Sequence, residues 1–250
     1  MIPLKDNIPT DRFPYVTVAL IIANVIVYLL AVSHGGSIIS GPDSHEVVKY
    51  GAIPAALTHC LGKHEVIAGS QLLCAPTGGM PTWQTVFTSM FMHASFLHIA
   101  GNMLFLWIFG NNVEDAMGPV KFVLFYILGG IAALALQVVI DPNSTVPTLG
   151  ASGAIAAVLG GYILLYPRAR VLTLVFIILF FTVIELPALI VLAVWFIVQA
   201  VFGAVNLTDP TGGGGGVAYF AHVGGFLFGL TTVKLLATRR KPVPPRYPVY

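Results

Sequence analysis

Long runs of apolar residues dominate this chain. A membrane-spanning helix needs about 20 mostly apolar residues, and six segments of about that length occupy approximately residues 14–33, 96–112, 119–140, 150–166, 187–204 and 217–237. Only 9% of the 250 residues are charged and 57% are hydrophobic, whereas soluble domains carry roughly 25% charged residues. The sequence therefore predicts an integral membrane protein and excludes a soluble nucleic-acid binder, a disordered chain and a disulfide-rich mini-protein.

The apolar stretch 171–204 is too long for a single crossing. Its 34 residues would extend about 51 Å as one helix, and Glu185 and Pro187 interrupt it. We expect that 171–184 either lies in the membrane without crossing it or forms a seventh span.

The distribution of Lys and Arg favours six spans. Cytoplasmic segments of membrane proteins carry an excess of these residues. With six spans and a cytoplasmic N-terminus, 10 of the 12 basic residues lie inside and only Lys49 and Lys63 lie outside. A seventh span would move the five basic residues of 234–246 to the outside. The sequence therefore predicts an all-α bundle of six transmembrane helices with both termini cytoplasmic and a long outer loop between helices 1 and 2.

This interpretation divides the chain into five parts. They are a cytoplasmic N-terminus (1–13), transmembrane helix 1 (14–33), the outer loop (34–95), a core of helices 2–6 (96–237) and a cytoplasmic tail (238–250). We expect the membrane to be the plasma membrane of a prokaryote.

Four polar residues stand near the starts of three apolar spans. His98 and Asn102 share one helix face at the start of the second span, Ser152 opens the fourth, and His222 lies early in the sixth. All three spans run from the outer face inward, so the four side chains are expected at one depth. Polar groups inside a bilayer are costly and commonly mark function. Each residue alone also has a structural interpretation, since Ser and Asn can simply link neighbouring helices.

A serine and a histidine at one depth suggest a nucleophile and its general base. Serine reacts only when a base takes its proton, and the resulting oxyanion needs fixed hydrogen-bond donors. The helix start at Ser152 offers backbone N–H groups, and His98 and Asn102 offer side-chain donors. No Asp or Glu within the spans is placed to orient His222, so the sequence predicts a Ser–His dyad and not a triad.

Three segments resemble the rhomboid family of intramembrane serine proteases. They are His93–Asn102 (HASFLHIAGN), Gly150–Ala154 (GASGA) and Ala221–Gly225 (AHVGG), and the resemblance extends over about 81–237. It implies that Ser152 is the nucleophile and His222 the base, with Ser152, His98 and Asn102 in the oxyanion hole. It also implies a hydrolase that needs no cofactor and cleaves single-span membrane proteins in or beside their transmembrane segments. Glu114 resembles the acidic turn that has a structural role in the family.

Other functions fit the sequence less well. An inactive rhomboid-like protein that binds membrane helices is the main alternative, but such relatives lack the Ser or the His, and this chain has both. A zinc protease needs H-E-x-x-H, and the His-Glu pairs at 45–46 and 64–65 lack the second His. An aspartyl protease needs two membrane aspartates, which are missing, and Glu185 with Pro187 is the only hint of a transporter. No basic and aromatic patch indicates nucleic acid.

The outer loop contains both cysteines of the chain, Cys60 and Cys74. In an oxidising compartment paired thiols form disulfides, so we predict a Cys60–Cys74 bond. Two alternatives remain, a pair of free thiols or a metal site that adds His59 and His64, although that spacing matches no standard zinc pattern.

Overall fold

The computed structural model describes residues 1–60, 66–68, 71–73, 80–177, 180–208 and 217–238. Its helices are α1 (Tyr15–Ser33), α2 (Ser44–Tyr50), α3 (Pro54–His59), α4 (Thr82–Thr88), α5 (Phe96–Phe105), α6 (Asn111–Met117), α7 (Pro119–Ile140), α8 (Ser152–Leu165), α9 (Ala188–Thr208) and α10 (Tyr219–Leu236). A 3₁₀ turn (Ser89–Phe91) follows α4, and a π-helix (Leu106–Gly110) joins α5 to α6. The strands are β1 (Ile2–Asp6), β2 (Gly36–Ser37), β3 (Gly41–Pro42), β4 (Val66–Ala68), β5 (Gln71–Leu73), β6 (Arg170–Ile177) and β7 (Phe180–Pro187).

Four of the described helices are long and apolar enough to cross a membrane: α1, α7, α9 over Ala188–Val205, and α10. A fifth candidate is a bent pair, Thr82–Phe91 with Phe96–Met117, whose halves meet at 77°. The four straight helices coincide with predicted spans 1, 3, 5 and 6 to within four residues. The predicted fourth span corresponds to α8, which has only 14 residues.

The segment left open by the sequence forms a β-hairpin. β6 pairs antiparallel with β7 and, on its other edge, with β1, which gives a three-stranded sheet in the order β1-β6-β7. The expected all-α class is therefore wrong for this part, and the molecule is mostly helical. The segment is rich in Val, Ile, Phe and Thr, which favour strands over helices. Arg170 pairs with Glu185 at 3.3 Å at the base of the hairpin, which accounts for the acidic residue without a transport role.

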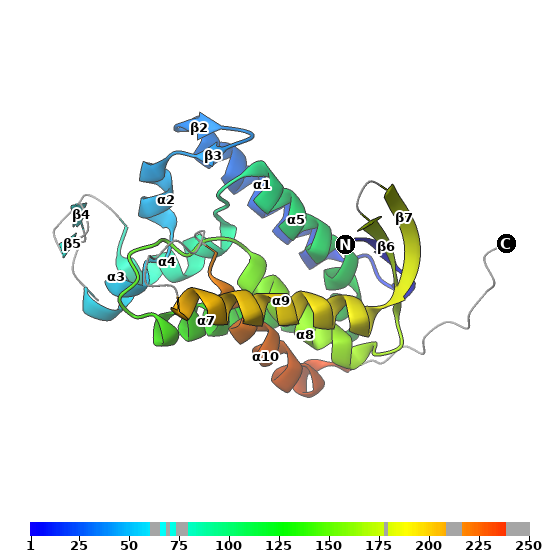
Figure 1. The fold of residues 1–250 in the computed structure, drawn as a ribbon. Helices are drawn as coiled ribbons and strands as arrows, with labels where there is room; N and C mark the ends of the chain where they lie inside the picture. The colour runs from blue at the N-terminus through cyan, green and yellow to red at the C-terminus, as the bar shows by residue number, and fades with distance from the viewer. Residues whose placement is uncertain (61–65, 69–70, 74–79, 178–179, 209–216, 239–250) are drawn as a thin grey trace.

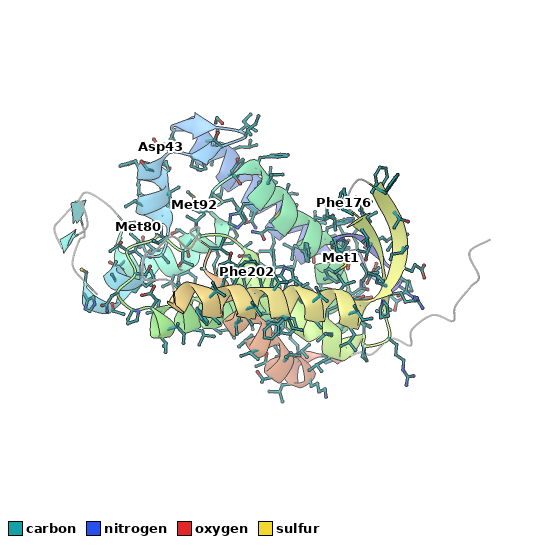
Figure 2. All side chains as sticks on the ribbon, viewed as in Figure 1. Met1, Asp43, Met80, Met92, Phe176 and Phe202 are labelled. Carbon is teal, nitrogen blue, oxygen red and sulfur yellow. The ribbon has the colours of Figure 1, made fainter. Side chains whose placement is uncertain are left out.

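The short elements lie at two opposite ends of the molecule. β1 and the β6–β7 hairpin lie at one end, and α2 and α3 lie at the opposite end, with the long helices between them (Figure 1). The labelled side chains of Phe176 and Met80 mark these two ends in Figure 2. The segment predicted as a plain outer loop, 34–95, contains α2, α3, α4 and four short strands.

Small residues let α8 and α10 approach closely. A Cβ atom on Gly225 would overlap the carbonyl oxygen of Gly153, and one on Gly229 would overlap that of Ala157. Close backbone approach of this kind is what small residues permit in membrane bundles. α8 is buried over almost its whole length, so it forms the centre of the bundle, and its contact with α10 fixes how the starts of the two helices meet.

Gly225→Ala should destabilise the protein strongly, because the new methyl group meets backbone that cannot rotate away. Overpacking of this kind costs about 1–3 kcal/mol. Gly101→Ala on α5 is the matched control, since a Cβ there has nothing within 4 Å and helix propensity favours Ala by about 1 kcal/mol. Thermal unfolding in detergent should give a lower Tm for Gly225→Ala and an equal or higher Tm for Gly101→Ala. Equal Tm values would contradict the close contact.

The N-terminal segment is tied to the helices by acidic side chains. Glu114 of α6 accepts hydrogen bonds from the backbone N–H of Val16 at 3.0 Å and of Thr17 at 2.8 Å, and from the Thr17 hydroxyl at 2.8 Å. It therefore satisfies free N–H groups in the first turn of α1. This contact gives Glu114 the structural role that the resemblance implied.

Asp6 is a second anchor of the N-terminal segment. Its Oδ2 accepts hydrogen bonds from the Tyr162 hydroxyl at 2.6 Å and from Asn112 Nδ2 at 2.7 Å. Burial raises the pKa of the Asp6 carboxyl from 3.8 to about 6. The folded state therefore binds this proton more tightly than the unfolded state, so Asp6 favours folding most below pH 4. Its contribution falls as the pH rises to about 6.

Asp6→Asn should consequently stabilise the protein at pH 7.5, where the buried carboxylate is charged, and much less below pH 4, where the carboxyl is protonated in both the folded and the unfolded state. Asparagine keeps an acceptor for Tyr162 and Asn112 but carries no charge. At about 1.4 kcal/mol per pKa unit, the gain is roughly 3 kcal/mol at most. The Tm of both proteins measured from pH 3.5 to pH 7.5 would show curves that diverge between about pH 4 and pH 6. Parallel curves would mean that Asp6 is not desolvated.

Candidate active site

Ser152 and His222 are in direct contact. Ser152 is the first residue of α8, and His222 lies in the first turn of α10. Ser152 Oγ and His222 Nε2 are 2.7 Å apart, a normal hydrogen-bond length. The two predicted residues, 70 positions apart in the chain, are therefore placed for a proton to pass from the hydroxyl to the imidazole.

The other side of His222 faces α9. Its Nδ1 lies 2.7 Å from Gln199 Oε1, and the Trp195 ring packs beside the imidazole with the centroids 5.7 Å apart. Sequence reasoning missed both residues. The signal was present for Gln199, since it is a polar side chain inside an apolar span, like His222. The sequence prediction of a dyad took account only of Asp and Glu as partners for His222.

Asn102 and His98 lie on α5 beside the dyad. The Ser95 side chain caps this helix by accepting from His98 N at 3.3 Å. Asn102 is buried, and its Nδ2 has no hydrogen-bond partner among the described residues. His98 Nδ1 accepts from Ala94 N at 3.4 Å, so the ring proton is on Nε2. A Cβ added at Gly150 would lie only 2.7 Å from that nitrogen, which places His98 against the loop that precedes Ser152.

The loop before Ser152 is held by its backbone. Gly150 has φ +116°, a conformation that favours glycine, and its N–H donates to the Ser89 carbonyl at 2.8 Å. Ala151 N–H donates to His93 Nε2 at 3.5 Å, and His93 Nδ1 lies 3.2 Å from the Phe91 carbonyl. His93 is fully buried. His93 therefore helps to hold the loop in place through its contact with Ala151, a role that the sequence motif did not reveal.

All four predicted side chains line one cavity of about 630 Å³. Ser152, His222, His98 and Asn102 border it, together with Trp195 and apolar residues of α5, α7 and α8. The first N–H groups of α8 have no acceptor within that helix and lie at the cavity wall. The cavity thus combines a nucleophile, a base and several hydrogen-bond donors in an apolar setting.

Within the described part of the chain, no group of three or more His, Cys, Asp or Glu is placed to hold a metal ion. His59 Nε2 instead lies 3.0 Å from Asn143 Oδ1. Cys60 is buried at the end of α3, whereas Cys74 and His64 lie outside the described residues. The Cys60–Cys74 disulfide therefore stays a prediction.

Alkylation of the intact protein followed by mass measurement tests this bond. Without reductant no alkyl group should be added, and with reductant two should be added. A disulfide closing a loop of about 15 residues contributes about 3 kcal/mol in the chain-entropy model, so reduction should also lower the Tm. Two alkyl groups added to the denatured, unreduced protein would show two free thiols.

Curated relatives match parts of the chain. The mitochondrial presenilin-associated rhomboid-like protein of Mus musculus is 28% identical over 183 residues, which cover 70% of this chain and 42% of the relative. The mitochondrial rhomboid protein 1 of Saccharomyces cerevisiae is 34% identical over 96 residues, 37% of this chain and 28% of the relative. The rhomboid protease GluP of Bacillus subtilis is 37% identical over 78 residues, 31% of this chain and 15% of the relative. The chain spans less than half the length of these relatives.

The relatives overturn one expectation, that of a prokaryotic plasma membrane. The mouse and yeast proteins are mitochondrial, and a further relative, rhomboid-like protein 11 of Arabidopsis thaliana, is chloroplastic. The prediction was wrong because the distribution of Lys and Arg orients a chain across a membrane but does not identify which membrane it is.

The match to a family model covers the whole candidate site. The model of the rhomboid domain aligns with residues 81–239, more than half of the chain. This range includes the broken helix with His98 and Asn102, the start of α8 with Ser152, and α10 with His222. On this match the chain belongs to the rhomboid family.

Proposed function

We propose that this chain is an intramembrane serine endopeptidase that cleaves the transmembrane segments of single-span membrane proteins. The observation that carries the proposal is the 2.7 Å contact between Ser152 Oγ and His222 Nε2 at the wall of a cavity that also contains a buried, unpartnered Asn102 amide. A structural Ser–His pair would not require a free donor beside it.

The proposed reaction is an acyl transfer in two halves. In the first, Ser152 Oγ attacks the scissile carbonyl carbon while its proton passes to His222 Nε2. The tetrahedral intermediate collapses when the C–N bond breaks, and the leaving amine takes the proton from His222. In the second half His222 removes a proton from water, which attacks the acyl-serine ester. The carboxylic acid product leaves, and the proton returns to Ser152.

The oxyanion of each intermediate needs donors that are already in place. Asn102 Nδ2 and His98 Nε2–H are two candidates, and the backbone N–H of Ser152 at the positive end of α8 is the third. Asn102 supports this role best, because a buried donor without a partner is costly in the resting protein. That cost is recovered only when an acceptor arrives in the cavity.

The proposal includes a topology of six spans. The six spans would be the four long helices, the bent pair that contains α5, and the shorter helix α8. α8 is about 21 Å long, shorter than the roughly 30 Å hydrocarbon layer, but it is surrounded by protein and its ends need not face lipid. Ser152 would then lie below the membrane surface. We retain the division into 1–13, 14–33, 34–95, 96–237 and 238–250, with both termini on the same side of an organellar membrane.

The test uses purified protein in proteoliposomes with a labelled single-span substrate. We expect cleavage within or beside the substrate's transmembrane segment, mapped by mass spectrometry, and labelling of Ser152 by a fluorophosphonate probe. Ser152→Ala should show neither. The alternative is an inactive rhomboid-like protein that binds membrane helices. It predicts that the substrate co-purifies with the protein but is not cut, and that Ser152 is not labelled by the probe.

A further inference from the structure

Gln199 of α9 faces α10 beside aromatic side chains. Phe196 stacks on Phe226 with ring centroids 4.5 Å apart, and Phe202, labelled in Figure 2, stacks on Tyr219 at 5.8 Å. Gln199 lies between Phe196 and Phe202 on this face, and its Oε1 is 2.7 Å from His222 Nδ1. An amide in such an apolar contact is costly unless it is hydrogen-bonded, and the imidazole is its partner.

We propose that Gln199 is a positioning residue for His222: its amide oxygen accepts the Nδ1 proton and holds the imidazole in the tautomer and orientation that leave Nε2 free to take the proton of Ser152. This inference rests on the proposed function, in which His222 is the general base. Gln199 does not touch the reacting atoms and acts only through the histidine.

The tautomer matters because a neutral imidazole carries one proton. If Gln199 donated from its amide nitrogen, His222 would be protonated on Nε2, and that nitrogen would point its proton at Ser152 Oγ and could not act as a base. With the amide oxygen facing Nδ1, one consistent chain runs from Ser152 Oγ–H to Nε2 and from Nδ1–H to Oε1. Trp195 packs beside the ring and restricts its rotation.

The choice of an amide also fits its surroundings. In soluble serine proteases a buried aspartate performs this task, but a charged side chain within a membrane span is expensive. A glutamine supplies the same acceptor without a permanent charge. The hydrogen bond strengthens when the ring becomes an imidazolium during proton transfer, so Gln199 favours the charged intermediate state over the resting state.

A purely structural role is the competing explanation. A side-chain hydrogen bond between two membrane helices can simply hold them together, and its loss would then lower stability without a specific effect on chemistry. Phe202→Leu is the matched control, because Phe202 packs on Tyr219 in the same α9–α10 interface and lies almost one helical turn from Gln199. The two roles differ in kcat and in the proton position on His222.

Gln199→Leu, Gln199→Glu and Phe202→Leu should be compared with the unchanged chain in proteoliposomes. We expect Gln199→Leu to lower kcat by roughly 10- to 100-fold, by analogy with the loss when a group that orients a metal-binding histidine is removed, with KM changed less than about threefold. Gln199→Glu restores the acceptor and should recover most of the kcat lost in the leucine variant. Phe202→Leu should lower the Tm with little change in kcat.

A second measurement needs no turnover. In protein labelled with ¹⁵N-histidine, the His222 signals, assigned by their loss in His222→Ala, should show the proton on Nδ1, and in Gln199→Leu this preference should weaken. A proton on Nε2 in the unchanged protein, wild-type kcat in Gln199→Leu, or the same loss of kcat in Phe202→Leu would overturn the role of Gln199. Failure of the protease proposal itself is separate, since it would appear as an uncut substrate and an unlabelled Ser152 while the proton on His222 is still measured.

Discussion

Ser152→Ala and His222→Ala should each abolish cleavage of a single-span substrate in proteoliposomes. The hydroxyl is a poor nucleophile unless Nε2 of His222, 2.7 Å away, takes its proton. Removing either member of such a pair in a soluble serine protease costs roughly 10⁶-fold in kcat. Because the two side chains act as a unit, the double variant should be no worse than either single variant.

The control for these variants is folding. Ser152→Ala removes one oxygen atom at a helix start, where no side-chain cap is lost, so its Tm should stay close to that of the unchanged chain. Product formation should be followed by mass spectrometry over long incubations to exclude slow turnover. Cleavage by Ser152→Ala at an appreciable fraction of the original rate would refute Ser152 as the nucleophile.

The dyad could be predicted because the sequence shows which polar residues lie in apolar spans, where they are costly, and at what depth in the membrane they lie. Ser152 and His222 are polar residues near the starts of apolar spans that run in the same direction, so topology alone puts them in one layer. The actual contact depends on more than topology. It requires the close packing of α8 and α10 at Gly225 and Gly229, and membrane topology does not determine that distance.

Gln199 illustrates what sequence reasoning leaves out. Its distance to His222 depends on the rotation of α9 about its own axis, which is set by the aromatic contacts of Phe196 and Phe202 with α10. Hydropathy does not determine that rotation, because most of α9 is apolar on every side. The sequence shows that Gln199 is a polar residue in an apolar span, but it does not show which helix its side chain faces.

The β-hairpin could not be predicted for a different reason. A continuous apolar run has no periodicity that separates a strand from a buried helix, and the pairing that stabilises β6 comes from β1, more than 160 residues earlier in the chain. Such long-range pairing is decided by the whole fold. The 77° bend before α5 was likewise hidden, since length and composition do not report a change of direction.

Asn102→Leu should separate catalysis from stability more sharply than any other change. Asn102 is buried on α5, and its Nδ2 lacks a partner in the described residues. A leucine of similar volume removes the unsatisfied donor, and an unsatisfied buried polar group costs about 1–3 kcal/mol. The Tm of Asn102→Leu should therefore be equal to or higher than that of the unchanged chain.

The same substitution should lower kcat by roughly 10²–10³-fold, the usual cost of losing one oxyanion donor. KM should change little, because the donor acts on the oxyanion and only weakly on the bound carbonyl. Asn24→Leu is the matched control for kcat: Asn24 is also fully buried in a span, and its Oδ1 lacks a partner among the described residues, but it does not line the cavity of the dyad, so kcat should stay unchanged. Full activity of Asn102→Leu would remove Asn102 from the oxyanion hole. A lower Tm without loss of kcat would show that its amide serves packing, and the stabilisation of the oxyanion would then fall to His98 and the start of α8.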